Sequence, residues 1–292
     1  MEWIHADVLK GNSDFLIEQL ARGYILPRFS VVKKIEEGSS HLQLSKIFST
    51  SVYDKNGNKN ITLNPESDDD RVSYYNSYDL HFQVPSQICF TFFMEVFRAK
   101  KIDYEILYKW LQNTWFGDET IKVYNGYSRN VIIADYLSAP LKLFFTELEK
   151  YINPTQGEVP NFVCALDSLT LKVEYIIRLL CEEHFNIPTS YIREDGLVEE
   201  KTFTALISDL IKEIENHPKL EPQMKELLLD DMIFVDFVMN SKAGLNIRNR
   251  IAHAHLDIEE YEPRKILHVL NVILRISKII KPQKKTQKID NQ

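Results

Sequence analysis

Hydrophobic residues recur at helical spacing through the second half of the chain and predict four helices there. These helices cover residues 166–180, 203–214 and 221–238 and a stretch that follows Pro263. The helix over 221–238 is apolar all round, which is typical of a central, buried helix. In the last helix we expect the inward positions to be Ile266, Leu267, Leu270, Ile273, Leu274 and Ile280.

The first half also has a helical pattern, interrupted by polar and proline-containing segments. A short helix is predicted between the cap Ser13 and Gly23, and longer ones follow at 86–97, 103–117 and 133–148. Pro140 either kinks the last of these or marks its true start. No convincing strand pair emerges, so the fold class is all-α.

The chain divides best at residues 153–160, which hold two prolines and a glycine. We therefore expect a mainly helical N-terminal region of unknown role over 1–155 and a bundle of four to five helices over 156–281. Residues 282–292 are basic and are expected to be a disordered tail. The acidic run at 67–70 favours solvated loop charge over a metal site.

Composition excludes some classes of protein. The chain of 292 residues is 44% hydrophobic with a net charge of −7, so any polyanion must meet a local basic patch. Cys89, Cys164 and Cys181 lack metal or disulfide spacing and are expected to be reduced core residues. The start is too polar for a signal peptide and the apolar run at 88–93 is too short for a membrane span. We expect a cytoplasmic protein with no cofactor and no membrane association.

The aromatic residues of the first half allow two interpretations. They could stack nucleic-acid bases, but their helical spacing favours core packing. The residues concerned are Phe90, Phe92, Phe93, Phe97, Trp110, Trp115 and Phe116.

The strongest candidate for chemistry lies between the last two predicted helices, at residues 244–255. Two arginines, two histidines and two asparagines are mixed there with aliphatic residues. Arg248 and His253 combine a phosphate-binding cation with an imidazole that titrates near neutral pH. If 246–256 is helical, Asn249 and His253 share a face while Arg248 is turned about 140° away from His253. Asn246 would cap the helix, whose N-terminus would favour a phosphate.

This stretch resembles the HEPN superfamily, whose motif is an arginine, a polar residue, three further residues and a histidine. Here the motif is Arg248, Asn249, Arg250-Ile251-Ala252 and His253, preceded by Gly-Leu-Asn-Ile. Glu174 and Arg178 on the helix at 166–180 match the helical Glu-x-x-x-Arg element of the C-terminal HEPN-type domain of large uncharacterised prokaryotic proteins. The resemblance covers residues 160–280.

The resemblance implies a metal-independent endoribonuclease that acts on single-stranded RNA as a homodimer. His253 would act as general base or acid, Arg248 would hold the scissile phosphate, and Asn249 would orient His253 or contact the phosphate. A prokaryotic defence or toxin role would add an antitoxin or regulatory protein as a partner. The alternative is a catalytically silent HEPN-type module that binds RNA or protein.

The sequence departs from the family pattern directly after the motif histidine. Ala254 stands where glycine is usual, and His255 occupies a position that holds a modifiable tyrosine in members paired with a nucleotidyltransferase. His255 is a second catalytic imidazole, a phosphate contact or a surface residue.

The remaining candidates support the motif. Glu174 and Arg178 either stabilise their helix or orient the motif residues. A group of cations either faces RNA or is scattered surface charge, namely Lys242, Arg250, Arg264 and Lys265.

Overall fold

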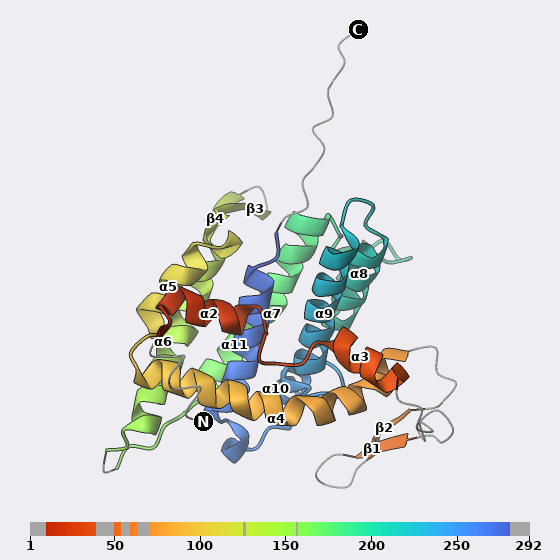
Figure 1. Cartoon of the computed structure of the whole chain (residues 1–292). Coiled ribbons are helices and arrows are strands. Elements are labelled where there is room, and N and C mark those ends of the chain that lie inside the picture. The colour runs from red at the N-terminus through yellow and green to blue at the C-terminus, as the bar shows by residue number, and fades with distance from the viewer. Residues whose placement is uncertain are drawn as a thin grey trace.

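The described part of the chain is predominantly helical, which confirms the all-α class. The computed structural model describes residues 10–38, 50–53, 59–63, 70–124, 127–155 and 157–280. The helices, drawn in Figure 1, are α2 (Ser13–Ala21), α3 (Phe29–Gly38), α4 (Asp70–Arg98), α5 (Tyr104–Gln112), α6 (Ile133–Ile152), α7 (Val163–Leu179), α8 (Phe203–Asn216), α9 (Pro222–Met239), α10 (Ile247–Ala252) and α11 (Pro263–Ser277). Short 3-10 turns occupy Trp115–Gly117 (η2) and Ile258–Glu260 (η4), and a π-helical turn, η3 (Leu180–Phe185), extends α7.

Three antiparallel hairpins accompany the helices, so the prediction that there is no strand pair was wrong. They pair β1 (Thr50–Tyr53) with β2 (Lys59–Leu63), β3 (Thr120–Tyr124) with β4 (Tyr127–Val131), and β5 (Ser190–Ile192) with β6 (Val198–Glu200). Their strands are three to five residues long. The three-residue strands β5 and β6 are too short to show the period-2 alternation by which a half-buried strand is recognised.

Capping side chains explain where several helices begin. The Asp103 carboxylate accepts a hydrogen bond from the Ile106 N–H at 2.8 Å, as the sequence predicted. At α2 the cap is Asn12 and not Ser13, because the Asn12 side chain accepts from the Phe15 N–H at 2.8 Å. Gly23, at φ 62°, follows the end of α2, where a left-handed residue is favourable.

Prolines do not mark the ends of the long helices of the first half. Helix α4 begins at Asp70 and runs through Pro85, so the predicted start at Ser86 was wrong. Pro140 likewise lies inside α6 and not at its start. The helices of the second half begin and end close to their predicted positions, because their apolar stripes are bounded by polar or proline residues.

The hydrophobic core is continuous across the two halves of the sequence. Helix α11 lies in the middle of the molecule, where it packs against α7 and α9 from the second half and against α2 and α6 from the first (Figure 1). Residues 153–155 and 157–160 lie between α6 and α7, and these two helices pack against each other. The first half of the chain therefore covers one side of the bundle that carries the motif.

The aromatic cluster of the first half belongs to this core, as its spacing predicted. Phe92, Phe93, Phe97, Trp110 and Phe116 are buried, and Phe90 and Trp115 pack against the core.

Two burial predictions need correction. Ile280, which was predicted to point inward, is 77% exposed because α11 ends at Ser277. Cys164, which was predicted to lie in the core, is exposed, and of the three cysteines only Cys89 and Cys181 are buried. Helix α11 also buries polar side chains that its apolar pattern did not indicate, among them His268, Asn271 and Arg275.

Some predictions concern parts of the chain outside the described residues. These are the disordered tail at 282–292 and most of the acidic run at 67–70. Within the described residues, no helix combines the length and apolar character that crossing a membrane requires.

Candidate functional site

Helix α10 carries the motif and is held against α9 by the segment that precedes it. The Leu245 N–H donates to the Phe237 carbonyl of α9 at 2.9 Å. A Cβ atom at Gly244 would collide with the same carbonyl oxygen, so only glycine allows this approach. Ile247 is fully buried and Ile251 packs against the core. The aliphatic residues of the stretch therefore anchor it, and the polar ones are left at the surface.

The helix is shorter than the stretch of 246–256 that we considered. Asn246 is the N-cap residue of α10, as predicted, but at φ 52° its side chain makes no capping bond to the backbone. Asparagine tolerates this left-handed conformation better than most residues. Its Oδ1 instead accepts from Nδ2 of Asn249 at 2.8 Å.

A tight C-terminal turn ends α10 at the motif histidine. The Ala254 N–H donates to the Ile251 carbonyl at 3.0 Å, and the His255 N–H donates to the Arg250 carbonyl at 2.7 Å. These two bonds form a Schellman motif, which places Ala254 in the left-handed region at φ 52°. Glycine suits that position best, which is the physical reason why it is usual there in the family pattern.

The Asn249 amide joins the motif to α9. Its Nδ2 donates to the Asn240 carbonyl at 3.1 Å as well as to Asn246. Its Oδ1 accepts from Nη1 of Arg248 at 3.0 Å. The hydrogen bonds of this side chain thus position Arg248 and the start of α10, and they do not run to His253.

Arg248 lies against α7, where it shares a carboxylate with a second arginine. Its Nη2 and Nε lie 3.1 Å and 3.3 Å from Oε2 of Glu174. The other oxygen, Oε1, accepts from Nη2 of Arg178 at 3.3 Å. Glu174 is therefore more than a helix-stabilising partner of Arg178, because it also orients the motif arginine across a sequence separation of 74 residues.

Part of the Arg248 guanidinium remains available for a ligand. Of the five N–H bonds of a guanidinium, Glu174 takes two and Asn249 takes one. The side chain is 31% exposed, so the two remaining N–H groups can reach an anion from solvent. The Arg248 guanidinium that would bind such an anion is already partly neutralised by the Glu174 carboxylate, which Arg178 shares.

His253 and His255 lie together at the exposed end of the turn. Both residues are exposed, and their ring centroids are 5.9 Å apart. Within the described residues the His253 imidazole makes no hydrogen bond. The structure thus gathers Arg248, Asn249 and Glu174 into one network and leaves the histidines outside it.

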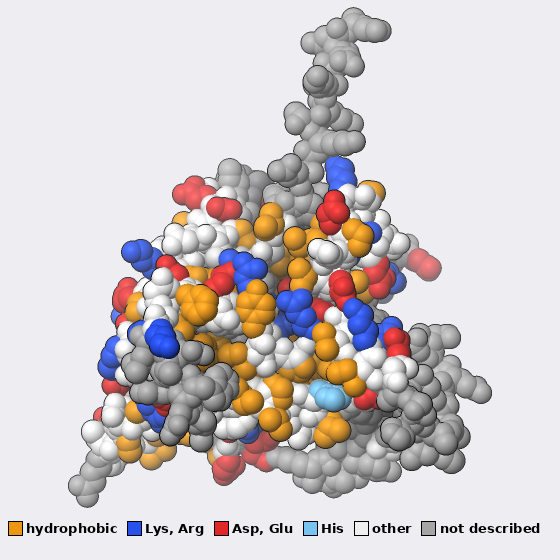
Figure 2. Space-filling model, viewed as in Figure 1, with side chains coloured by type: hydrophobic (Ala, Val, Ile, Leu, Met, Phe, Trp, Pro, Cys, Tyr) orange, Lys and Arg blue, Asp and Glu red, His pale blue; other side chains and the backbone are white. Residues whose placement is uncertain are grey.

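Most of the predicted basic patch is neutralised by carboxylates of the segment that follows. Arg250 makes two short bonds to Glu260, at 2.6 and 2.7 Å. Lys265 lies 3.8 Å from Glu260 and 3.6 Å from Glu262, and Arg264 lies 3.2 Å from Glu262. Of the four predicted cations only Lys242, which is exposed, has no carboxylate partner within the described residues. On the face drawn in Figure 2, Lys and Arg side chains are likewise interspersed with Asp and Glu.

Two partners of the site were not predicted, although the sequence contained a signal for one of them. Asp257 and Glu260 have capping-box spacing, and the Asp257 N–H donates to Glu260 at 3.2 Å. That cap places Glu260 beside Arg250. Asn240, which anchors Asn249, is the C-cap of α9.

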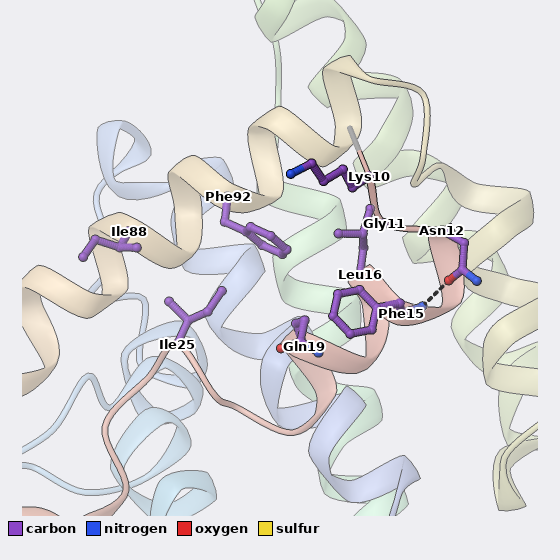
Figure 3. Close-up of a pocket in the computed structure, with 9 residues that line it drawn as sticks. All are labelled: Lys10, Gly11, Asn12, Phe15, Leu16, Gln19, Ile25, Ile88 and Phe92. Carbon is purple, nitrogen blue, oxygen red and sulfur yellow. Dashed lines mark hydrogen bonds between the residues drawn. The ribbon is translucent and has the colours of Figure 1, made fainter. Parts of the chain in front are cut away.

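A separate apolar cavity of about 630 Å³ lies between α2 and α4 (Figure 3). It is lined by Lys10, Gly11, Asn12, Phe15, Leu16, Gln19, Ile25, Ile88 and Phe92. The Asn12 amide oxygen is occupied by the Phe15 N–H, and few other polar groups converge on the space. The motif therefore remains the better candidate for chemistry.

No group of three His, Cys, Asp or Glu side chains within the described residues is arranged to hold a metal ion. No protein-family model, curated protein or solved structure matches the chain.

Proposed function

We propose that the chain is a metal-independent endoribonuclease of the HEPN type, acting on single-stranded RNA. The observation that carries the proposal is the arrangement of α10. One short helix presents an oriented arginine with two unused N–H groups and, at its C-cap, an exposed imidazole.

These two groups suit the cleavage of RNA by its own 2′-hydroxyl. His253 would take the proton from the ribose 2′-OH, whose oxygen attacks the phosphorus while the bond to the 5′-oxygen breaks. The leaving 5′-oxygen takes a proton from a second imidazole, and the products carry a 2′,3′-cyclic phosphate and a 5′-hydroxyl. Arg248 would stabilise the charge that develops on the phosphate oxygens.

The second imidazole would be His255, whose ring centroid lies 5.9 Å from that of His253, or the His253 of a second copy of the chain, and the resemblance to HEPN proteins favours the second copy. Exposed aliphatic residues near the motif support such an association. Leu171, three residues before Glu174 on α7, and Ile258, in η4, are each 65% exposed. Burying them between two copies would bring two motifs onto a common cleft. In this reading the protein is an effector of a prokaryotic defence or toxin system, restrained by an antitoxin or regulatory protein.

A second candidate function is a catalytically silent HEPN-type module that binds RNA or protein. It is favoured by the ion pairs that already occupy Arg248, Arg250 and Lys265. If Glu174 holds Arg248 permanently, the arginine orients the fold and does not bind a scissile phosphate.

Cleavage of a labelled single-stranded RNA in EDTA separates the two functions. We expect His253→Ala and Arg248→Ala each to lower the cleavage rate by at least about 100-fold, because general acid–base and electrostatic catalysis each contribute on that scale. His81→Ala, which changes another partly exposed histidine, on α4, is the matched control and should cleave at the wild-type rate. The product ends are mapped for a 2′,3′-cyclic phosphate.

Persistent cleavage in both motif variants would contradict the proposal. RNA binding without cleavage by the wild type, surviving in His253→Ala, would establish the silent module. Circular dichroism of each variant shows whether the fold has been kept.

A further inference from the structure

The β5–β6 hairpin is an unusually exposed apolar element. Every residue from 191 to 200 is exposed. Ile192 and Val198 are cross-strand partners, 73% and 70% exposed, and Leu197 beside them is 61% exposed. Burying side chains of this size is favourable, so a partner that covers them would bind more tightly.

The backbone of the hairpin is open as well. Within the described residues β5 pairs only with β6, which leaves the outer edge of each strand without a neighbour. Open edges of this kind are templates for an added strand, and proteins blunt them with very short strands, charged side chains, proline or a covering element. The two short strands contain neither lysine nor proline, and the charge that they carry, on Glu199 and Glu200, is acidic and so admits a basic strand. An extended polypeptide can therefore pair here.

The charge of the hairpin indicates the chemistry of that polypeptide. Residues 190–200 hold four carboxylates and one arginine. Arg193 forms ion pairs within the hairpin, 3.1 Å from Asp195 and 3.7 Å from Glu199. The acidic excess repels RNA phosphates and attracts lysine and arginine. Aliphatic residues opposite Ile192 and Val198 would complete the match.

The base of the hairpin is bound to the same arginine that shares Glu174 with the motif. Arg178 Nη2 donates to the Lys201 carbonyl at 2.9 Å, and Nη1 lies 2.7 Å from Glu200. The same Nη2 donates to Glu174, whose other oxygen holds Arg248. Three consecutive ion pairs, Glu200–Arg178, Arg178–Glu174 and Glu174–Arg248, therefore connect the end of β6 to the motif.

We propose that the β5–β6 hairpin is the docking surface for a basic, aliphatic polypeptide partner that adds an extended strand to it. Binding tightens the base of the hairpin and, through Arg178 and Glu174, fixes the position of Arg248. The docking surface does not depend on the proposed function. The effect of partner binding on activity does rest on the proposed function.

Three decapeptide probes test the docking surface on the full chain by fluorescence anisotropy. The first alternates lysine and valine, the second glutamate and valine, and the third lysine and serine. We expect the lysine–valine peptide to bind at least about tenfold more tightly than either of the others, because it alone offers both charge and aliphatic contact.

Paired variants locate the binding site. The double variant Ile192→Ser with Val198→Ser should weaken binding of the lysine–valine peptide by at least about tenfold. The matched control is Leu80→Ser with Val84→Ser on α4, two aliphatic residues of similar exposure, 70% and 68%, outside the hairpin. It should bind like the wild type. Equal binding by both double variants, or equal binding of all three peptides, would overturn the proposal.

Two further outcomes would assign the surface to a different occupant and also overturn it. One is concentration-dependent self-association in sedimentation that the hairpin variant abolishes, which indicates a second copy. The other is peptide binding only after truncation at Ile280, which indicates the chain's own basic C-terminal segment.

Hydrogen exchange tests the connection to the motif without reference to cleavage. On peptide binding, the amides of residues 250–255 should exchange severalfold more slowly in the wild type but not in Arg178→Met, because the pairing to Glu174 is lost. If the peptide binds but exchange at α10 is unchanged in the wild type, the connection is refuted while the docking surface stands. An inactive enzyme that still shows both effects would refute only the proposed function.

Discussion

Ala254 is the residue where the backbone of the motif carries strain. Its φ of 52° costs an alanine about 1 kcal/mol that a glycine does not lose, because the Cβ approaches the following carbonyl group. The Schellman bonds of Ala254 and His255 nevertheless hold the turn, and the turn directs the His253 side chain to solvent. One alanine therefore supports the geometry of the site at a cost in stability.

We expect Ala254→Gly to raise the free energy of unfolding by about 1 kcal/mol, measured by urea denaturation. The matched control is Ala252→Gly at the last position of α10, where glycine should lower it by roughly 0.5–1 kcal/mol. A shift in the same direction in both variants would contradict the assignment of strain to Ala254.

At the scale of elements, α7 positions α10 through side chains and not only through apolar contact. Glu174 binds Arg248, and Asn249 adds a hydrogen bond to the same guanidinium. The two charges of the Glu174–Arg248 pair are 22% and 31% exposed, so water screens them only in part. The orientation of the motif arginine should therefore depend on a measurable coupling between α7 and α10.

A double-mutant cycle with Glu174→Gln and Arg248→Met measures that coupling. We expect a coupling free energy of about 0.5–1.5 kcal/mol from the four urea midpoints, since partly buried charged pairs exceed surface pairs. The control cycle uses Lys34 and Glu226, whose side chains are 70% and 49% exposed and whose N–O distance of 2.7 Å is shorter than the 3.1 Å between Arg248 and Glu174. Its coupling should be smaller. Equal coupling in both cycles would show that Glu174 has no special role in holding Arg248.

At the scale of the whole molecule, α11 is the helix that both halves of the chain share. Its polar residues are buried among elements from each half. His268 Nε2 lies 3.2 Å from Ser86 Oγ on α4, and Arg275 Nη1 donates to Asp231 on α9 at 3.3 Å. The Arg275 guanidinium stacks 3.9 Å above the ring of Phe234. The His268–Ser86 contact joins α11 to the first half, whereas the contacts of Arg275 with Asp231 and Phe234 lie within the second half.

Burial of His268 makes stability depend on pH. Burial, reinforced by the charges of Arg264 and Lys265, lowers the pKa of His268 to about 3. Between about pH 6.5 and 3, His268 therefore binds a proton in the unfolded chain but stays neutral in the folded chain. The free energy of unfolding consequently decreases as pH falls from about 6.5 towards 3. We expect His268→Met to lack this loss. The difference in unfolding free energy, wild type minus variant, should decrease by up to about 1.4 kcal/mol per pH unit across that window.

Asp231 provides the control because its contribution has the opposite sign. Burial raises the pKa of Asp231 to about 6 despite the opposing charge of Arg275. The stabilising contribution of the Asp231 carboxyl to the folded state is therefore present below about pH 4 and is lost as pH rises through 6. Relative to Asp231→Asn, the wild type should lose stability upwards from pH 4 to 6. If the two differences in unfolding free energy, wild type minus His268→Met and wild type minus Asp231→Asn, change with pH in the same direction, the opposite pKa shifts of His268 and Asp231 are refuted.

The sequence by itself determined the helices of the second half and the position of the motif. Periodic apolar residues, prolines and capping side chains act within a few residues, so α8 and α9 begin and end near their predicted positions. The anchoring role of the aliphatic residues around α10 was predictable for the same reason. The aromatic cluster of the first half also followed from its spacing.

Only the tertiary structure decided which groups surround the motif. The pairing of Arg248 with Glu174 joins residues on two helices far apart in the sequence, and no local pattern encodes such a contact. The same holds for the carboxylates that neutralise Arg250 and Lys265, and for the polar residues buried on α11. Helix formation depends on neighbouring residues, whereas the electrostatic environment of a side chain depends on how the helices pack. The exposure of the β5–β6 hairpin likewise depends on how the helices pack, because only the packed molecule shows which apolar residues remain uncovered.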